Sequence, residues 1–441
     1  MLIQIAHNAV NAKLLTENKE LKYTLSELLS YQVSGYENMS NFQNGNWDGR
    51  SSFFNFKKAT FPAGFVLMVK SKFEQMGHQV QIIRPKIPEP IGDPEMKFNP
   101  YGRTPEYEYQ YECVEKLLKQ HQMIARIATG GGKTMCSMLS ISRIGRKTLF
   151  LTTRKTLMYQ MKKNIEKTMK LEVGVIGDSV MDVKPFVNVG MVQTIAANLK
   201  TRTIQEEVVR LKELEHNKFE KLIAEKDKIL TKQLKLGHIT LQTKFKILSD
   251  FKKELNSKTK DLAVLQRAAT INCKIMNRKK AEMEKLLSTF EFVIAEEAHE
   301  SGGNEYFEVM QYCTNAHYRL ALTATPFMKD DEEANMRLMA CSGIIGIVVT
   351  EKELIDKGIL AKPYFMFINN ARPTGVFPTT NYVSAYEKGI VKNNIRNDEI
   401  VKWSKWSTDR NLPVLILVNR TEHGNILKDL IQKQGLKCNF I

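Results

Sequence analysis

The fold is decided by the stretch ATGGGKT at residues 128–134. It follows a short apolar run, residues 122–128, and precedes a segment with helical spacing that extends to about residue 142. Consecutive glycines let the backbone wrap closely around phosphate groups at the positive end of a helix. The sequence therefore predicts a phosphate-binding loop between a strand and a helix, formed by Thr129, Gly130, Gly131 and Gly132.

The two residues after the glycines have separate predicted roles. Lys133 is expected to reach the β- and γ-phosphates of ATP, and the Thr134 hydroxyl is expected to bind Mg²⁺. ATP and Mg²⁺ are therefore the predicted cofactors.

An acidic pair follows a second apolar run, in VIAEEAH at residues 293–299. When a nucleotide is bound beside such a pair, one carboxylate supports the metal and the other polarises the attacking water. We assign the first role to Glu296 and the second to Glu297. The alternative interpretation of this pair is a solvated acidic start of a helix.

A third segment, LTATP at residues 322–326, also follows an apolar run. Its two hydroxyls, on Thr323 and Thr325, are expected to hydrogen-bond the acidic motif and transmit its state. Strand patterns recur at 148–151, 187–191, 292–295 and 318–322 with helical patterns between several of them. That alternation predicts an α/β fold with a parallel sheet covered by helices.

The region before residue 93 has a different pattern, which predicts a small α+β N-terminal domain over 1–92. NGNWDGR at 44–50 predicts tight turns between short strands, and residues 64–76 have helical spacing. Prolines in 84–105 predict an extended linker. Trp47 and Arg50 are candidates to contact a base and a phosphate of nucleic acid, or else a core tryptophan and a surface arginine.

A long helical pattern interrupts the α/β rhythm at 203–289, inside a predicted lobe over 93–345. It indicates two long helices that reverse near residues 237–240, a coiled-coil-like hairpin. It holds 20 Lys+Arg and 12 Asp+Glu, a net of 20 − 12 = +8. The hairpin is either a solvated spacer or a surface that contacts DNA. A second α/β lobe is predicted over 346–441, with strands at 413–418 and 437–441 and a helix at 421–434.

Composition bounds the function. The 441 residues carry a net charge of +17, which favours a polyanionic partner, foremost nucleic acid. No apolar run is long enough to span a membrane, and the six cysteines form no CxxC pair, so neither a zinc site nor a disulfide framework is supported. We expect a cytoplasmic protein.

The order and content of these motifs resemble those of superfamily 2 helicases, the DEAD/DEAH-type motors. NGNWDGR, the helix after it and VNRTEHG at 418–424 resemble, more narrowly, the phage UvsW-type helicases. The resemblance implies RecA-like lobes behind a nucleic-acid-binding domain. It also implies that Gln110 reads adenine with help from Arg103, that Arg154, Gln193 and Thr194 contact a DNA strand, and that His299 joins Thr323 and Thr325 in coupling.

By this resemblance, the expected function is an ATP-dependent DNA helicase or translocase that unwinds or branch-migrates junctions, forks and R-loops, in recombination, repair and replication. RNA–DNA hybrids are further expected partners. Three departures stand out: Glu296 replaces the usual aspartate, the helical insertion has no counterpart, and later motifs of the second lobe, an arginine finger included, are absent. We interpret the last as a fragment, a disrupted reading frame or a lobe completed by a second chain.

Two alternatives remain open at the level of sequence. One is the motor subunit of a restriction-type complex, which shares the ATPase motifs. The other is a DNA-binding protein with a vestigial ATPase.

Overall fold

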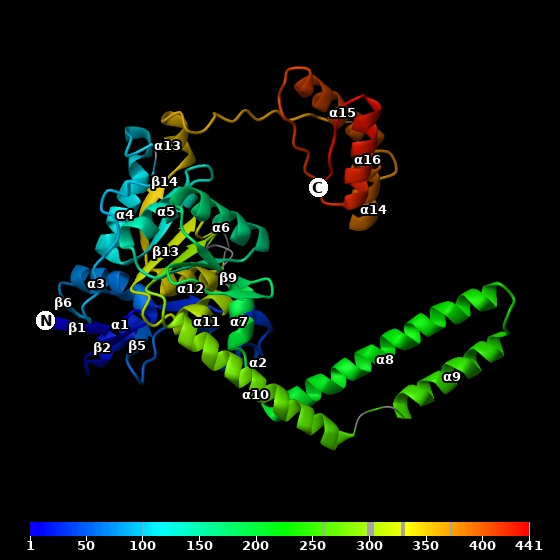
Figure 1. The fold of residues 1–441 in the computed structure, drawn as a ribbon, viewed down its shortest axis with the longest axis horizontal. Helices are drawn as coiled ribbons and strands as arrows, with labels where there is room; N and C mark the ends of the chain where they lie inside the picture. The colour runs from blue at the N-terminus through cyan, green and yellow to red at the C-terminus, as the bar shows by residue number, and fades with distance from the viewer. Residues whose placement is uncertain are drawn as a thin grey trace. The chain divides into compact units, whose positions relative to one another are not determined.

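The computed structural model describes residues 1–99, 101–257, 259, 261–297, 304–327, 331–370 and 373–440. The chain divides into two compact units, Met1–Ala361 and Lys362–Ile441, which are described separately (Figure 1). The first unit contains the N-terminal domain, the large sheet and the helical arm.

The large sheet has eight strands in the order β10-β9-β11-β8-β12-β13-β7-β14. All neighbouring strands run parallel except the edge pair β9 and β10. The predicted α/β class is thereby confirmed. The strands are β7 (Gln122–Ile127), β8 (Thr148–Thr152), β9 (Val173–Gly177), β10 (Val180–Asp182), β11 (Val187–Met191), β12 (Phe292–Glu296), β13 (Tyr318–Thr323) and β14 (Ile345–Val349).

Helices cover both faces of this sheet, because successive strand residues point to opposite sides. In β12, Phe292 and Ile294 enter one hydrophobic core, whereas Val293 and Ala295 enter the other. The first core is completed by α4 (Glu108–Gln120), α5 (Lys133–Ile144) and α6 (Lys155–Met169); the second by α7 (Val192–Leu199), α11 (Asn304–Tyr312) and α12 (Glu332–Ser342).

The N-terminal domain is built on a four-stranded sheet of order β5-β2-β1-β6. It packs directly on the lobe: a Cβ at Gly64 would lie 2.1 Å from the Met339 carbonyl oxygen, and Ala340 joins the domain's core. The predicted helix at 64–76 is confirmed as α3. The elements are β1 (Leu2–His7), β2 (Asn11–Leu15), α1 (Lys19–Leu28), β3 (Ser30–Gln32), η1 (Tyr36–Asn38), α2 (Ser40–Gln43), β4 (Arg50–Ser52), β5 (Thr60–Pro62), η2 (Ala63–Phe65), α3 (Val66–Gln75) and β6 (Gln79–Ile83).

The proline-rich linker has neither helix nor strand over residues 84–91, in agreement with the prediction, whereas turns form at 94–95 and 97–98 before η3 (Pro105–Tyr107). It is also fastened to the lobe. The Ile91 N–H donates to the Ile144 carbonyl at 3.0 Å, and the Tyr318 hydroxyl donates to the Pro88 carbonyl at 2.9 Å. The linker therefore fixes the N-terminal domain in place.

The helical arm consists of three helices, α8 (Ile204–Lys235), α9 (Leu241–Ser257) and α10 (Leu262–Leu287) (Figure 1). The reversal at residues 237–240 was predicted correctly, with Gly237 at φ +73°. The prediction of one continuous second helix was wrong. Between Leu255 and Leu262 the sequence is entirely polar, so a helix there has no apolar side chain to bury and Asp261 instead starts a new helix.

The predicted boundary after residue 345 was also wrong. Residues Ile345–Val349 form β14, which pairs with β7 at the edge of the large sheet. The next helix, α13 (Glu351–Asp356), buries Leu354 in the same core, so the first unit extends to Ala361.

The second unit contains α14 (Tyr382–Tyr386), a π-helical turn η4 (Glu387–Val391), α15 (Asn394–Thr408) and α16 (Thr421–Lys433). The predicted helix at 421–434 is confirmed. The strands expected at 413–418 and from 437 are not observed: residues described in this unit form no strand, and Leu415 and Leu417 are 82% and 85% exposed. An extended segment forms a sheet only where a neighbour pairs with its backbone, and no such neighbour is present among these residues.

Candidate active site

The predicted motifs meet at one edge of the large sheet. Because β7, β12 and β13 are parallel neighbours, the loops after them leave from the same side. In the pairing register, Glu296 lies opposite Leu322, and Thr323 lies opposite Arg126. The glycine-rich loop, the acidic pair and the threonine motif are therefore adjacent in space.

The glycine-rich loop has a left-handed backbone conformation at two of its glycines. Gly130 and Gly132 have φ values of +85° and +76°, which L-residues with a Cβ rarely adopt. Gly132 caps α5, and its carbonyl accepts from the Met135 and Cys136 N–H groups at 2.8 and 3.1 Å. The positive end of α5 therefore faces the loop, where an anion is stabilised.

An ion pair joins the loop to the acidic motif. The Lys133 ammonium lies 3.4 Å from a Glu297 carboxylate oxygen, and the lysine side chain is only 9% exposed. Glu297 has a φ of +48°, a conformation that costs free energy in a non-glycine residue and is concentrated at functional sites. The sheet edge thus holds a buried cation against a strained acidic residue.

The neighbouring carboxyl group, at the end of β12, is in an environment that disfavours its charge. Burial raises the pKa of Glu296, the adjacent Glu297 raises it further, and Lys133 opposes both. A cation bound here would relieve that penalty. Glu296 and the Thr134 hydroxyl supply the hard oxygen ligands that Mg²⁺ prefers, so the residues present fit this metal.

The helix before the loop is attached to it by two side chains. The Gln110 amide donates to the Gly131 carbonyl at 3.4 Å, and the Tyr109 hydroxyl donates to the same oxygen at 2.7 Å. A Cβ at Gly132 would lie 2.5 Å from the Gln110 nitrogen. Gln110 was a candidate from the sequence, whereas Tyr109 was missed; its position beside Gln110 was the available signal.

Arg103 lies at the surface near the start of α4. Its guanidinium is paired with Glu108 and Glu115 and lies 5.3 Å from the centre of the Tyr111 ring. It is held by carboxylates rather than by the glycine-rich loop, and its role in adenine recognition stays a prediction.

The threonine motif is ordered around a buried hydroxyl. Thr323, the last residue of β13, is fully buried, and its hydroxyl oxygen accepts from the Thr325 N–H at 3.2 Å. It lies one residue beyond the position paired with Glu296, and its coupling role stays a prediction. His299 lies outside the described residues.

The candidate DNA-contacting residues of the lobe follow two further strands of the same edge. Arg154 precedes α6 after β8 and is exposed. Gln193 and Thr194 lie in the first turn of α7 after β11, with Gln193 exposed. Their contact with DNA stays a prediction.

Trp47 and Arg50 form a local structure in the N-terminal domain. The Trp47 indole donates to the Arg50 carbonyl at 2.6 Å, and the Arg50 guanidinium reaches the Ser30 hydroxyl at 3.1 Å and Glu332 at 3.4 Å. Glu332, in the first turn of α12, also accepts from the Gln32 N–H at 2.8 Å. This acceptor could not be found from the sequence, because a surface glutamate has no distinguishing pattern.

None of the described helices is long and apolar enough to cross a membrane.

Two family models match the chain. The model described as the res subunit of type III restriction enzymes matches residues 104–328, about half of the chain. The model of the N-terminal domain of the DNA helicase UvsW matches residues 4–83. The first contains the glycine-rich loop and the acidic motif, and the second contains the NGNWDGR segment.

One solved structure has the same fold at low sequence identity, and a second is similar. The crystal structure of T4 UvsW is 15% identical, covers 98% of this chain and 73% of its own, and has a TM-score of 0.50. A structure of the UvsW helicase from bacteriophage T4 is 16% identical, covers 79% of this chain and 100% of its own, and has a TM-score of 0.49. No curated protein matches the sequence.

Proposed function

We propose that this chain moves on branched DNA by hydrolysing ATP. The chain belongs to the family of type III restriction enzyme res subunits and is a superfamily 2 helicase resembling UvsW. The observation that carries the proposal is the ion pair between Lys133 and Glu297 at the sheet edge. It supports the proposal because the assigned phosphate-binding cation and the candidate base would then both lie within reach of one nucleotide.

Each residue of the edge has a role in the proposed hydrolysis. The N–H groups of the glycine-rich loop and the Lys133 ammonium hold the phosphates, with Gln110 reading the adenine and Arg103 assisting. Thr134 and Glu296 hold Mg²⁺, which neutralises charge on the phosphates when bound. Glu297 orients the attacking water once the phosphates draw Lys133 away from it.

Coupling to movement is proposed to run through the threonine motif. Thr323 is buried next to the acidic pair, and its hydroxyl holds the Thr325 N–H. A change in what binds Glu296 and Glu297 alters the loop 324–327 that follows. Such a gated step links hydrolysis to the position of the bound DNA.

The DNA is proposed to contact Arg154, Gln193 and Thr194 on the lobe, with the N-terminal domain on the duplex side. The net charge of +17 supports a polyanionic partner. The proposed substrates are junctions, forks and R-loops, RNA–DNA hybrids included, in the host cytoplasm. Trp47 and Arg50 would contribute by holding the turn 44–50 against α12. In this arrangement their side chains would not contact DNA directly.

A junction assay tests the proposal. A labelled four-way junction incubated with the protein should resolve into two duplexes with ATP, and should stay intact with ADP. The Glu297→Gln variant should bind the junction as tightly and leave it intact. Resolution of the junction without ATP, or by the variant, would contradict the proposal.

The second candidate function is the motor of a restriction-type complex, because the model that matches half of the chain carries that description. Such a motor translocates along duplex DNA without separating strands. A triplex-forming strand on a linear duplex distinguishes the two: its displacement with ATP, while junctions and forks stay intact, would favour the restriction-type motor. Tight DNA binding with no ATP turnover would favour a vestigial ATPase.

A further inference from the structure

Helix α12 is shared by the large sheet and the N-terminal domain. On one side, Leu338 lies in a core of the large sheet. On the other side, Ala340 is buried in the core of the N-terminal domain, where Met336 and Met339 pack against it. Among the described residues, the lobe contributes to that core only through α12 and Phe307 of α11. A displacement of α12 is therefore felt by both parts.

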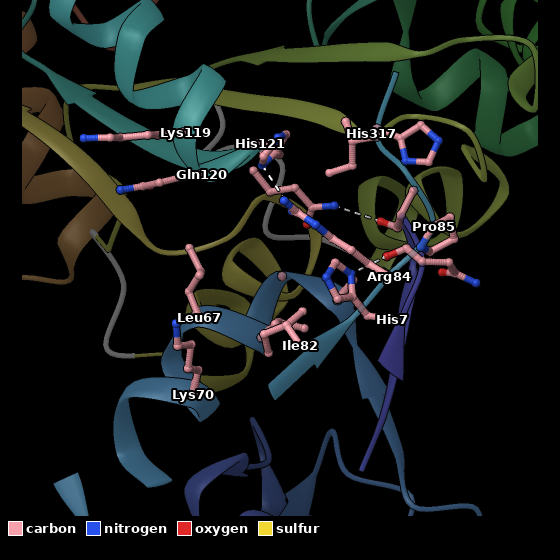
Figure 2. A pocket seen from close by; sticks show the side chains of 17 residues that line it. His7, Leu67, Lys70, Ile82, Arg84, Pro85, Lys119, Gln120, His121 and His317 are labelled. Atoms are coloured by element: carbon pink, nitrogen blue, oxygen red, sulfur yellow. Dashed lines mark hydrogen bonds between the residues drawn. The ribbon is translucent and has the colours of Figure 1, made fainter. Parts of the chain in front are cut away.

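The interface between the domain and the large sheet is less closely packed away from α12. A cavity of about 350 Å³ lies there, lined by elements other than α12. Figure 2 shows side chains of the domain, such as Leu67 and Ile82, and side chains of the lobe, such as Gln120 and His317, around it. Atoms that line a cavity lack close contacts on one side. The packed contact on α12 therefore holds the two parts together more firmly than this region does.

The C-terminal end of α12 lies against the backbone of the domain. A Cβ at Gly64 would lie 2.1 Å from the Met339 carbonyl oxygen and 2.6 Å from that of Ala340, so the approach requires glycine. The Cys341 carbonyl accepts from the buried Arg319 guanidinium at 3.1 Å. Since Arg319 belongs to β13, the strand that leads into the threonine motif, this end of α12 connects the domain to that strand.

The first turn of α12 makes a second contact with the domain. One carboxylate oxygen of Glu332 accepts from the Gln32 N–H at 2.8 Å and lies 3.4 Å from the Arg50 guanidinium. Gln32 and Arg50 are opposite each other in the pairing of β3 with β4. A single carboxylate therefore holds both strands of this pair at the start of α12, the helix that follows the threonine motif in the chain.

The β3–β4 pair and its turn are themselves tightly held. The Gly49 carbonyl accepts from the Gln32 side-chain amide at 2.9 Å and from the Val33 N–H at 3.0 Å. Gly49 has a φ of +79°, and a Cβ there would lie 2.5 Å from the Tyr36 ring. Because the turn is fixed by these contacts, a force on the domain passes to Glu332 with little loss.

We propose that α12 couples the N-terminal domain to ATP hydrolysis, with Glu332 as the positioning residue through which DNA on the domain increases turnover. This inference rests on the proposed function, in which the domain contacts DNA and the threonine motif responds to ATP. Glu332 acts by fixing the first turn of α12, whose other end is bonded to β13. A shift of the domain on DNA then changes the position of the threonine motif beside Glu296 and Glu297.

ATP hydrolysis by the full chain, with and without saturating four-way junction DNA, tests the proposal. Glu332→Ala removes both contacts, whereas Glu332→Gln keeps an oxygen for the Gln32 N–H and loses the charge that attracts Arg50. Glu333→Ala is the matched control, because Glu333 lies in the same turn and pairs with Arg337 within α12. Junction affinity and the thermal unfolding midpoint are measured for each variant.

Glu332→Ala should lower kcat in the presence of junction DNA about 3- to 10-fold, because a partly exposed, charge-assisted contact is worth about that factor. The kcat without DNA, the KM for ATP and the junction affinity should stay within about twofold. Glu332→Gln should recover part of the stimulation, and Glu333→Ala should leave all of these quantities within about twofold. A residue that only stabilises the fold would instead lower the unfolding midpoint and both kcat values together.

Four results would overturn the proposal. They are an equal fall of kcat with and without DNA, a loss of junction affinity with unchanged kcat at saturating DNA, the same loss of stimulation in Glu333→Ala, and unchanged stimulation in both Glu332 variants. If junction DNA stimulates the unmodified chain, these results contradict the coupling alone. If junction DNA does not stimulate the unmodified chain, the proposed function fails together with the coupling.

Discussion

The sheet edge that carries the nucleotide motifs and the helical arm over 204–287 use the same residue types in opposite ways. At the edge, Lys133 is 9% exposed and paired with a strained glutamate. In the arm, the pair of Arg278 and Glu282 has side chains that are 83% and 63% exposed. The edge holds the Lys133 ammonium in a buried position, whereas this pair of the arm lies in water.

The free energy that is lost when an ion pair is broken differs by about an order of magnitude between the two environments. A desolvated pair interacts strongly and is costly to break, because removal of one partner leaves a buried charge. An exposed pair contributes about 0–1 kcal/mol and is screened by salt. We therefore infer that substitutions at the edge strongly change ATP hydrolysis, whereas those in the arm have small effects on DNA binding.

The largest effect is expected from Lys133→Ala. It removes the cation assigned to the phosphates and leaves Glu297 without that partner, so ATP turnover should fall by about 10²- to 10³-fold. Steady-state ATPase rates measure this. Lys280→Ala in the arm, whose partner is Glu284 at 3.7 Å, is the matched control and should retain the turnover.

Two glycines with the same backbone conformation sharpen the comparison. Gly132→Ala, at φ +76°, would also place a Cβ 2.5 Å from the Gln110 amide and should raise the KM for ATP at least about 10-fold. Gly237→Ala, at φ +73° in the arm turn, has no neighbour within 4 Å. It should cost about 1–2 kcal/mol of local stability and leave the KM unchanged. Similar KM values for the two variants would refute the assigned role of the loop.

The base of the arm, like the sheet edge, contains a buried carboxylate that is paired with a cation. Glu207 is fully buried and accepts from Arg210 at 2.7 and 2.9 Å and from Asn272 at 3.0 Å. The Arg210 hydrogen bonds lower the pKa of Glu207 to about 2. Since the folded pKa lies below its usual 4.5, this stabilisation is present above pH 4.5 and is lost as the pH falls toward 2.

Glu207→Gln should therefore destabilise the packing of α8 on α10 by about 1–2 kcal/mol at pH 7. Hydrogen exchange of the amides in 204–215 and 262–273 measures it, and Glu282→Gln is the exposed control. Equal exchange in the two variants would mean that the buried pair contributes nothing.

The smallest effect concerns DNA. Replacing residues 203–289 by a short glycine-serine loop removes a net of +8, so if the arm touches DNA, junction binding should weaken several-fold and the slope of log K against log salt should flatten. Titrations at three salt concentrations measure the slope. An unchanged slope would identify the arm as a spacer.

Predictions from the sequence were most successful where a residue pattern is compatible with a single local structure. Three glycines before Lys133 predicted the loop, and the alternation of apolar runs with helical patterns predicted the sheet. It was uninformative where the partner is distant: the acceptor Glu332 lies 282 residues from Arg50. Residues 345–349 read equally well as the start of a new lobe, because an edge strand is recognised only by its neighbour β7.

The arm illustrates the same limit. Apolar spacing predicted helices, and Gly237 marked their reversal. The break before α10 rests on six polar residues, 256–261, whose composition is also tolerated on the exposed face of a helix. Only the packing of α10 on α8 separates the two possibilities.

The most direct test of the central claim is single-turnover and steady-state ATP hydrolysis by Glu297→Gln, with and without junction DNA, beside ATP binding measured separately. If Glu297 orients the attacking water, hydrolysis should fall by at least about 10²-fold in both conditions while ATP binding stays within about twofold. Hydrolysis by the variant at the rate of the unmodified chain would contradict the account.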